Sequence, residues 1–130
     1  MKKIILTTLL ILTTISICIA NDADDMLQAV KKSLTDTMPF YQNMNNCNPY
    51  QYKDWGGLIY KVYGIENNAC HIQRGSQHCY YPLEINKKYS AGKISLYKRK
   101  IATINQTGSY DSSDSANDYF ATMDSRYCRY

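Results

Sequence analysis

The sequence predicts an α+β fold: an N-terminal helix packed on a three- or four-stranded antiparallel meander, with two disulfides and a short C-terminal helix. Three observations lead to this class. Apolar residues recur at helical spacing between positions 23 and 34, residues 57–81 contain short strand-like runs separated by turn residues, and four cysteines follow position 20. Once an export signal is removed from the 130 residues, the length suits one domain.

The first twenty residues have the three-part layout of a secretory signal peptide. Two lysines precede an uncharged apolar run from Ile4 to Ala20, which ends in Cys-Ile-Ala. This run is 17 residues long, at the lower limit for a transmembrane helix, and no basic flank follows it. We therefore expect residues 1–20 to be a signal peptide and residues 21–130 to form a single secreted domain without a transmembrane segment. The two-lysine start is typical of bacterial export, so a periplasmic or extracellular location is predicted.

Basic residues are concentrated in the middle of the chain. The predicted mature part has 13 basic and 11 acidic residues, and residues 53–104 hold nine of the basic and three of the acidic ones. A basic stripe in this segment attracts nucleic acid, anionic lipid or an acidic partner, or else is simply a solvated face. No specific nucleic-acid motif accompanies it. The candidate binding residues of this stripe are Lys87, Lys88, Lys93, Lys98, Arg99 and Lys100.

An amphipathic helix is predicted for residues 23–34. Its apolar face consists of Ala23, Met26, Leu27, Val30 and Leu34. Pro39 disfavours helical geometry at the preceding residue and is expected to end the run. Residues 42–57 are rich in Asn, Gly and Pro and predict a loop.

Strands and tight turns are predicted next. β-Branched and aromatic residues fill the runs, and Asn and Gly, which tolerate positive φ, fill the turns. In order, these are a strand ending at Gly64, the turn Asn67-Asn68, the strand 69–73, the turn Arg74-Gly75, and the strand 77–81, which Pro82 ends.

The segment after Pro82 is ambiguous. Ile94, Tyr97, Ile101 and Ile104 have helical spacing, whereas the run KISLY favours a fourth strand, and a strand is preferred here. Residues 107–118 are a polar loop. A short helix is expected after it, with Tyr119, Phe120, Met123 and Tyr127 on one face.

The decapeptide CHIQRGSQHC, residues 70–79, is nearly palindromic. If Arg74-Gly75 is the centre of its turn, Cys70 lies opposite Cys79 in a pair without hydrogen bonds, whose close β-carbons suit a disulfide. A Cys70–Cys79 bridge leaves Cys47 to pair with Cys128. The pairings 47–79 with 70–128 and 47–70 with 79–128 remain open.

The same register places His71 opposite His78. Two imidazoles are too few for a zinc site, so neither a metal site nor a cofactor is predicted. An exposed cross-strand polar pair is the preferred interpretation, and the alternative is an acid–base pair. A turn at Asn67-Asn68 puts His71 on the apolar face with Tyr60 and Val62, and a one-residue slip exchanges the faces. The sequence does not choose between these registers.

The segments CNPY (47–50), YGIENNAC (63–70) and HCYY (78–81) resemble a pattern in small exported bacterial proteins of uncharacterised function. These proteins look like a signal peptide, a helix, a C-x-P-Y turn, a G-x-x-N-x-x-C hairpin and a third strand with a cysteine. The similarity spans about residues 23–85. Asn67-Asn68 stands where relatives carry Asn-Gly, and Cys128 lies outside the pattern. The resemblance implies a helix against an antiparallel sheet, and no activity.

The function expected from these observations is a secreted, non-enzymatic binding protein. All thirteen tyrosines follow the predicted signal, and tyrosine is common on half-exposed sheets and binding faces. The partner is an unidentified macromolecule, either a protein or an envelope component. The alternative is a small nuclease-like hydrolase in which His71 and His78 act as acid and base.

Overall fold

The structure is a computed structural model that describes residues 2–110, 112 and 117–130. The α+β class is confirmed. In chain order the elements are α1 (Lys2–Asn45), β1 (Tyr50–Lys53), β2 (Ile59–Glu66), β3 (Ala69–Arg74), β4 (Gln77–Pro82), α2 (Leu83–Thr107), α3 (Asn117–Tyr127) and β5 (Cys128–Arg129).

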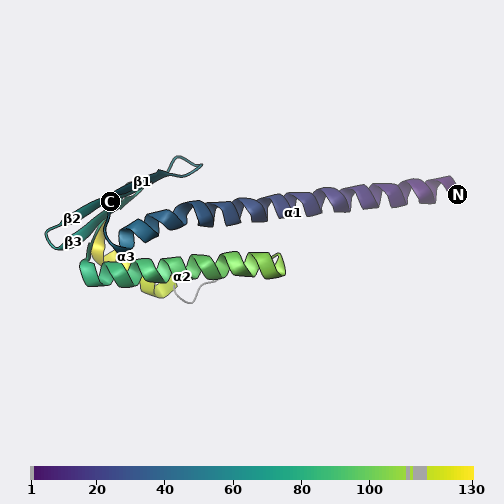
Figure 1. Cartoon of the computed structure of the whole chain (residues 1–130). Helices are drawn as coiled ribbons and strands as arrows, with labels where there is room; N and C mark the ends of the chain where they lie inside the picture. Colours follow the sequence, from purple (N-terminus) through teal and green to yellow (C-terminus); the bar gives the residue numbers. More distant parts are fainter. Residues whose placement is uncertain (1, 111, 113–116) are drawn as a thin grey trace.

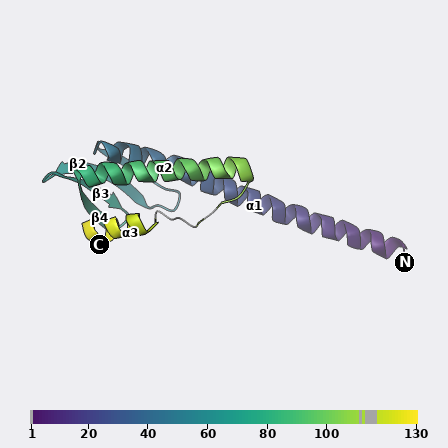
Figure 2. The ribbon, with the colours of Figure 1, turned by 90° about the horizontal axis from the view of Figure 1, so that it is seen from below.

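The strands form one antiparallel sheet in the order β1-β2-β3-β4-β5. It therefore has five strands rather than the expected three or four. The added strands are β1, which lies in the expected loop 42–57, and the two-residue β5. α1 and α2 lie side by side and run in opposite directions, and the N-terminal part of α1 extends well beyond α2 (Figure 1, Figure 2).

The core lies between the helices and one face of the sheet. Its fully buried side chains come from all layers: Phe40 and Met44 of α1, Val62, Ile72 and Tyr81 of the sheet, and Tyr89 of α2. Ring contacts join the layers, with centroids 5.3 Å apart for Phe40 and Tyr60 and 4.8 Å apart for Tyr81 and Tyr89. Edge-to-face and tilted aromatic pairs of this kind add to the burial energy.

The expectation that Pro39 ends the first helix is wrong. α1 contains Pro39 and continues to Asn45. Pro39 lacks the N–H that would bond to Thr35, a loss of about 3 kcal/mol in a helix interior. The turn after Pro39 carries Phe40 and Met44, both fully buried, and their burial outweighs this loss. The predicted apolar stripe 23–34, by contrast, is only partly covered, with Met26 66% exposed.

The preferred strand around residues 94–98 is also wrong, because this segment belongs to α2. Its buried positions follow the helical period: Asn86, Tyr89, Ser90, Leu96 and Ile104. Gly108, at φ 63°, ends the helix and donates its N–H to the Ile104 carbonyl. The expected short C-terminal helix is present as α3.

The first predicted hairpin turn is confirmed and the second is shifted. Asn67 and Asn68 have φ of 50° and 62°, as a two-residue hairpin turn of this type requires. In the next hairpin Arg74 pairs with Gln77, so the turn is Gly75-Ser76. Gly75 has φ 60°, and a Cβ there would lie 2.6 Å from Leu58 Cδ1. The positive φ favours glycine at the first turn position, and this turn moves the register by two residues.

The register shift changes the disulfides. Cys70 now lies opposite Tyr81, and Cys79 lies opposite Ile72 on one side and Cys128 on the other. The expected Cys70–Cys79 and Cys47–Cys128 bridges are wrong. The two disulfides are Cys47–Cys70, which fastens the end of α1 to β3, and Cys79–Cys128, which joins β4 to β5.

The expected signal segment is helical from Lys2 and continuous with the rest of α1. Within the part of the chain that the structure describes, no helix combines the length and the apolar character needed to cross a membrane.

Candidate functional site

The two faces of the sheet differ in what covers them. The inner face carries Val62, Ile72 and Tyr81, and side chains of the helices pack against it. The opposite face, called the outer face below, carries aromatic, polar and basic side chains, most of which are exposed or half-buried. Its main residues are Gln51, Lys53, Lys61, Tyr63, His71, Gln73, His78, Tyr80 and Arg129.

A bulge in β2 decides which residues reach the outer face. Val62 pairs with Ile72 but Gly64 pairs with His71, so Tyr63 is the extra residue. Gly64 has φ 121°, a conformation that other residues rarely adopt. The bulge supplies the one-residue slip that the sequence left open. It directs Val62 and Cys70 inward and His71 outward.

A stack of four side chains stands on the outer face. The His71 ring lies between Tyr63 and Tyr80, with centroids 4.2 Å and 4.3 Å away and interplanar angles of 13° and 18°. Lys61 Nζ lies 4.2 Å from the Tyr63 centroid, within cation–π distance of that ring. Because both of its faces are covered, His71 is only 8% exposed although it belongs to the outer face.

Two hydrogen bonds connect a carboxylate to both histidines. Glu66 Oε1 lies 3.0 Å from His71 Nδ1, and His71 Nε2 lies 2.9 Å from His78 Nδ1. A carboxylate can only accept, so His71 Nδ1 donates to Glu66. When the pair carries no extra proton, His71 Nε2 must accept from His78 Nδ1, which leaves His78 Nε2 as an unprotonated acceptor. This chain of contacts is called the Glu66–His71–His78 relay below.

The predicted histidine pair is therefore real but differently placed. His71 lies directly opposite Tyr80, and His78 lies opposite Gln73. The two imidazoles meet on the diagonal, a distance that ring side chains can bridge. Among the described residues, no group of three or more His, Cys, Asp or Glu side chains is arranged to hold a metal ion.

A row of polar residues crosses all five strands beside the stack. Cross-strand pairing places Gln51 beside Lys61, Lys61 beside Gln73, Gln73 beside His78, and His78 beside Arg129. Tyr63 donates its hydroxyl hydrogen to Gln73 Oε1 over 2.7 Å, which ties the row to the stack. The outer face is thus a continuous surface of tyrosine, histidine and basic side chains.

The predicted basic stripe on α2 is not a single surface. Lys87, Lys88, Lys98 and Arg99 are exposed, whereas Lys93 and Lys100 are half-buried. Lys93 Nζ lies 4.1 Å from the Phe120 ring centroid, and Lys100 Nζ lies 5.1 Å from that of Tyr110. Lys88 Nζ lies 5.5 Å from the Tyr119 centroid, so three of the six candidates contact aromatic rings of the chain itself.

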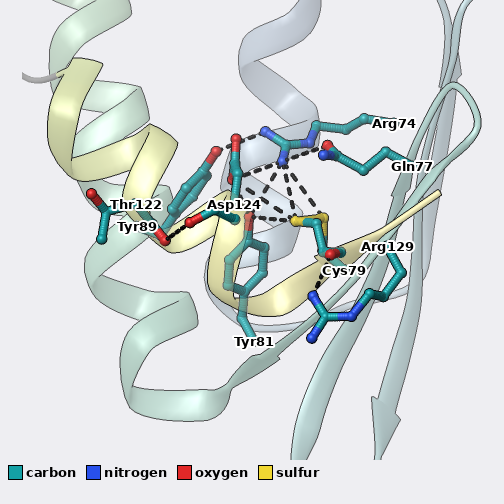
Figure 3. Close-up of polar contacts among 10 residues, drawn as sticks. Arg74, Gln77, Cys79, Tyr81, Tyr89, Thr122, Asp124 and Arg129 are labelled. Atoms are coloured by element: carbon teal, nitrogen blue, oxygen red, sulfur yellow. Dashed lines mark hydrogen bonds and ion pairs between the residues drawn. A yellow bond between two sulfur atoms is a disulfide. The ribbon is translucent and has the colours of Figure 1, made fainter.

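A second polar cluster, on the inner side, is centred on Arg74 (Figure 3). Its Nη2 lies 2.9 Å from Asp124 Oδ1, and its Nη1 donates to the Tyr89 hydroxyl over 2.7 Å. Tyr81 donates to the same Asp124 oxygen over 2.5 Å. Arg74 Nη2 also lies 3.6 Å and 3.7 Å from the two sulfurs of the Cys79–Cys128 disulfide. The cluster joins β3 to α2, α3 and the disulfide.

Burial shapes the ionisation of this cluster. Burial raises the pKa of the Tyr81 and Tyr89 phenols well above their ordinary value, so both are neutral at neutral pH. Burial by itself would lower the pKa of Arg74, but the surrounding phenol groups and Asp124 raise it overall. With the phenols neutral, Asp124 is the anionic partner of the guanidinium. The arrangement is that of a structural ion pair.

Several of these residues escaped the sequence analysis. Glu66, Tyr63 and Tyr80 join the histidines only through the bulge and the shifted register. None of these three residues has a strong local signal in the sequence. Arg74 was assigned to a turn, where its role in the inner cluster is invisible. The bulge had one available signal, Gly64 inside an otherwise strand-like run.

Comparison with known proteins adds no assignment: no family model, no curated protein and no solved structure matches this chain. The resemblance to small exported bacterial proteins stays a prediction.

Proposed function

We propose that this chain is an exported, disulfide-stabilised binding protein without enzymatic activity, and that the outer face of its sheet contacts a macromolecular partner. The observation that supports this proposal is the concentration of aromatic and basic side chains around His71 and His78 on one sheet face: Tyr63, Tyr80, Lys61 and Arg129. Tyrosine and arginine are among the residue types enriched at interfaces, and the surface is contiguous rather than scattered.

Export is part of the proposal. The Lys-Lys start and the apolar run to Ala20 support a signal peptide, and two disulfides are compatible with an oxidising compartment, periplasmic or extracellular. The test is to express the full chain in a bacterium, fractionate the cells, and sequence the N-terminus of the exported form. We expect it to begin at Asn21. Protein that stays in the cytosol with Met1 and free thiols would contradict export.

Two charge-reversal variants test the contact surface. One is Lys53→Glu/Lys61→Glu/Arg129→Glu on the outer face. The matched control, Lys87→Glu/Lys88→Glu/Lys98→Glu, makes the same change of charge on exposed α2 residues. The oxidised proteins are used to capture partners from envelope extract at low and high salt.

We expect the outer-face variant to lose the partner that the wild-type protein retains at low salt, and the α2 variant to keep it. Charge-driven contacts weaken as salt screens them, so capture should also fall at high salt. Loss with the α2 variant alone would instead identify the predicted stripe on α2 as the contact surface.

A hydrolase remains the second candidate because of one observation, the Glu66–His71–His78 relay. Its outer nitrogen, His78 Nε2, is a base when the pair is neutral. The three cavities described for this chain, of about 490, 350 and 270 Å³, are lined by other residues, so the binding function is favoured. If hydrolysis of any substrate is found, His78→Gln should abolish it. Full activity in that variant would remove the hydrolase.

A further inference from the structure

We propose that His78 is a proton-dependent contact for an acidic polysaccharide: its Nε2 binds a carboxylate of the polymer once the His71–His78 pair has taken up one proton. The inference rests on the proposed function, because the outer face is its site. It adds the chemical class of the partner and a means of control by pH.

The hydrogen bonds determine what His78 offers at its outer nitrogen. With Glu66 accepting from His71, and His71 accepting from His78, the neutral pair holds an unprotonated His78 Nε2. A lone pair at this atom accepts hydrogen bonds and repels a carboxylate oxygen. The neutral pair therefore disfavours an anionic ligand.

One added proton reverses the character of this atom. If the proton stays on His78, its Nε2 becomes an N–H donor and both hydrogen bonds are kept. If His78 Nδ1 passes its proton to His71, the charge lies beside Glu66, and His78 Nε2 still carries the added proton. Both protonated forms present the same outward N–H. The relay thus converts proton uptake into a change from acceptor to donor.

A second proton is not compatible with the observed contact. His71 Nε2 and His78 Nδ1 are 2.9 Å apart and share one hydrogen. Two fully protonated rings would place two N–H groups against each other. Only one proton is therefore coupled to binding while the pair remains intact.

The groups around the pair favour an anion on this surface. Glu66, Tyr63 and Lys61 come from β2, Tyr80 comes from β4, and Arg129 comes from β5 beside His78. Glu66 is already hydrogen-bonded to His71. Lys61 and Arg129 stand three strands apart, about 14 Å at the usual strand spacing. They can bind successive charges of an extended anionic chain.

The ring geometry favours a sugar polymer over a nucleic acid. Stacking of bases on single-stranded nucleic-acid binders needs open aromatic faces. Here the His71 ring covers one face of Tyr63 and one face of Tyr80, and Lys61 Nζ lies 4.2 Å from the Tyr63 centroid. The surface also offers hydroxyls, side-chain amides and the His78 ring, with cations at intervals. Hydroxyl-rich chains with spaced carboxylates fit this pattern.

A lipid surface fits less well. Membrane-surface binding depends on protruding apolar side chains in addition to basic ones. Among the residues whose exposure the structure describes, Trp55 in the β1–β2 loop and Met26 on α1 are prominent apolar side chains of this kind, 92% and 66% exposed. They lie outside the outer-face residues, so we commit to the polysaccharide.

The relay is tested first without any ligand. NMR spectra of the ¹⁵N-histidine-labelled full chain report the tautomer of each ring. At pH 8.5 we expect His78 in the Nδ1–H form, and we expect Nε2 to gain a proton as the pH is lowered. Glu66→Gln keeps an acceptor but removes the charge, and should change the tautomer populations. Tyr80→Phe keeps every relay hydrogen bond and should not. Finding His78 in the Nε2–H form at high pH would overturn the relay.

Binding is then measured by calorimetry with alginate as the probe. Its carboxylates stay charged above about pH 5, since carboxylic acids titrate near pH 4. The affinity should rise by up to about tenfold for each unit fall in pH within the titration range, which corresponds to one proton taken up. Neutral dextran should not bind at any pH.

His78→Gln supplies a donor that does not titrate, so its alginate affinity should no longer vary with pH in this range. Lys87→Gln on α2 is the matched surface control and should behave as wild type. A His78→Gln protein that keeps the full pH dependence would overturn the assignment to His78. Equal or tighter binding of polyglutamate or oligothymidylate would overturn the polysaccharide.

The outcomes separate this inference from the proposed function. Alginate binding that needs Lys61 and Arg129 but is equal at all pH values leaves the contact surface standing and overturns the proton coupling. A relay seen by NMR, with no polyanion bound at any pH, overturns the ligand class proposed here. The outer face would still be tested separately by capture from envelope extract.

Discussion

Cys79 and Cys128 lie directly opposite each other on β4 and β5, and their disulfide closes the last pairing of the sheet. β5 has only two residues, so few backbone hydrogen bonds hold it. We therefore expect the disulfide to be the main interaction that holds the C-terminal strand on the sheet. It also places Arg129 beside His78 on the outer face.

The disulfide pairing can be tested by removing cysteines in pairs. Cys79→Ala/Cys128→Ala and Cys47→Ala/Cys70→Ala should each leave the other bridge formed. Their loops span 49 and 23 residues, so chain entropy predicts losses of about 4 and about 3.5 kcal/mol in the free energy of unfolding. Urea unfolding measures these losses.

The mismatched variant Cys47→Ala/Cys79→Ala is the control. It leaves Cys70 and Cys128 without their partners, so a thiol assay should find two more free thiols than in either matched variant. Cys18 adds one further free thiol to every variant that retains residues 1–20. Equal thiol counts in all three would contradict the pairing.

Asp124→Asn should destabilise the protein by about 2 to 3 kcal/mol, because it leaves the buried Arg74 guanidinium without an anionic partner. The value is below that for a fully buried pair, since the Asp124 side chain is 26% exposed. Adding Arg74→Met to this variant should recover part of the loss. Asp36→Asn breaks the exposed Lys32–Asp36 pair on α1 and should change stability little. Similar losses for Asp124→Asn and Asp36→Asn would contradict the structural role of the Arg74 cluster.

Gly64→Ala should cost about 1 to 2 kcal/mol, because φ of 121° strains any residue with a Cβ. Space is not the reason, since the nearest atom to that Cβ is Pro49 Cγ at 3.9 Å. Gly56→Ala, at a glycine without positive φ, should stay within about 0.5 kcal/mol of wild type. Thermal unfolding compares them. An unchanged Gly64→Ala protein would show that the bulge can relax.

Alkaline pH should destabilise the fold. Burial raises the pKa of Tyr97 in the folded protein, whereas in the unfolded chain a phenol titrates near pH 10. Above that pH the unfolded state loses the proton first, so stability is intact below about pH 10 and falls as pH rises. Each such tyrosine contributes a slope of up to about 1.4 kcal/mol per pH unit. Tyr97→Phe should reduce the slope, as measured by urea unfolding between pH 9 and pH 11.5, and an unchanged slope would argue against burial.

The sequence predicted the class of fold and the local features with strong signals. Periodicity identified the first and last helices, and Asn67-Asn68 identified a turn whose backbone angles are confirmed. It failed where tertiary contacts decide. Pro39 is tolerated because Phe40 and Met44 are buried, and α2 is a helix because Tyr89 and Leu96 need the same covered face.

In the candidate site, too, local sequence signals were predicted correctly and features set by tertiary contacts were not. The near-palindrome pointed to two histidines on neighbouring strands, and they do meet. Their exact partners depended on the Gly75-Ser76 turn, in which Gly75 has a positive φ and lies close to Leu58 in the loop before β2. Which side chains of β3 point to the same face as Val62 depended on one extra residue in β2, Tyr63. A period-two pattern carries no information about such an insertion.

The order of the sheet also implies an order of assembly. β1 to β4 join consecutive segments, so these hairpins can form locally and early. β5 returns to β4 only after α2 and α3 have been traversed and packed, and the oxidation of Cys79 with Cys128 is accordingly a late event. A folding intermediate with Cys47–Cys70 formed and the C-terminal thiol still free is the species expected to accumulate when oxidant is scarce.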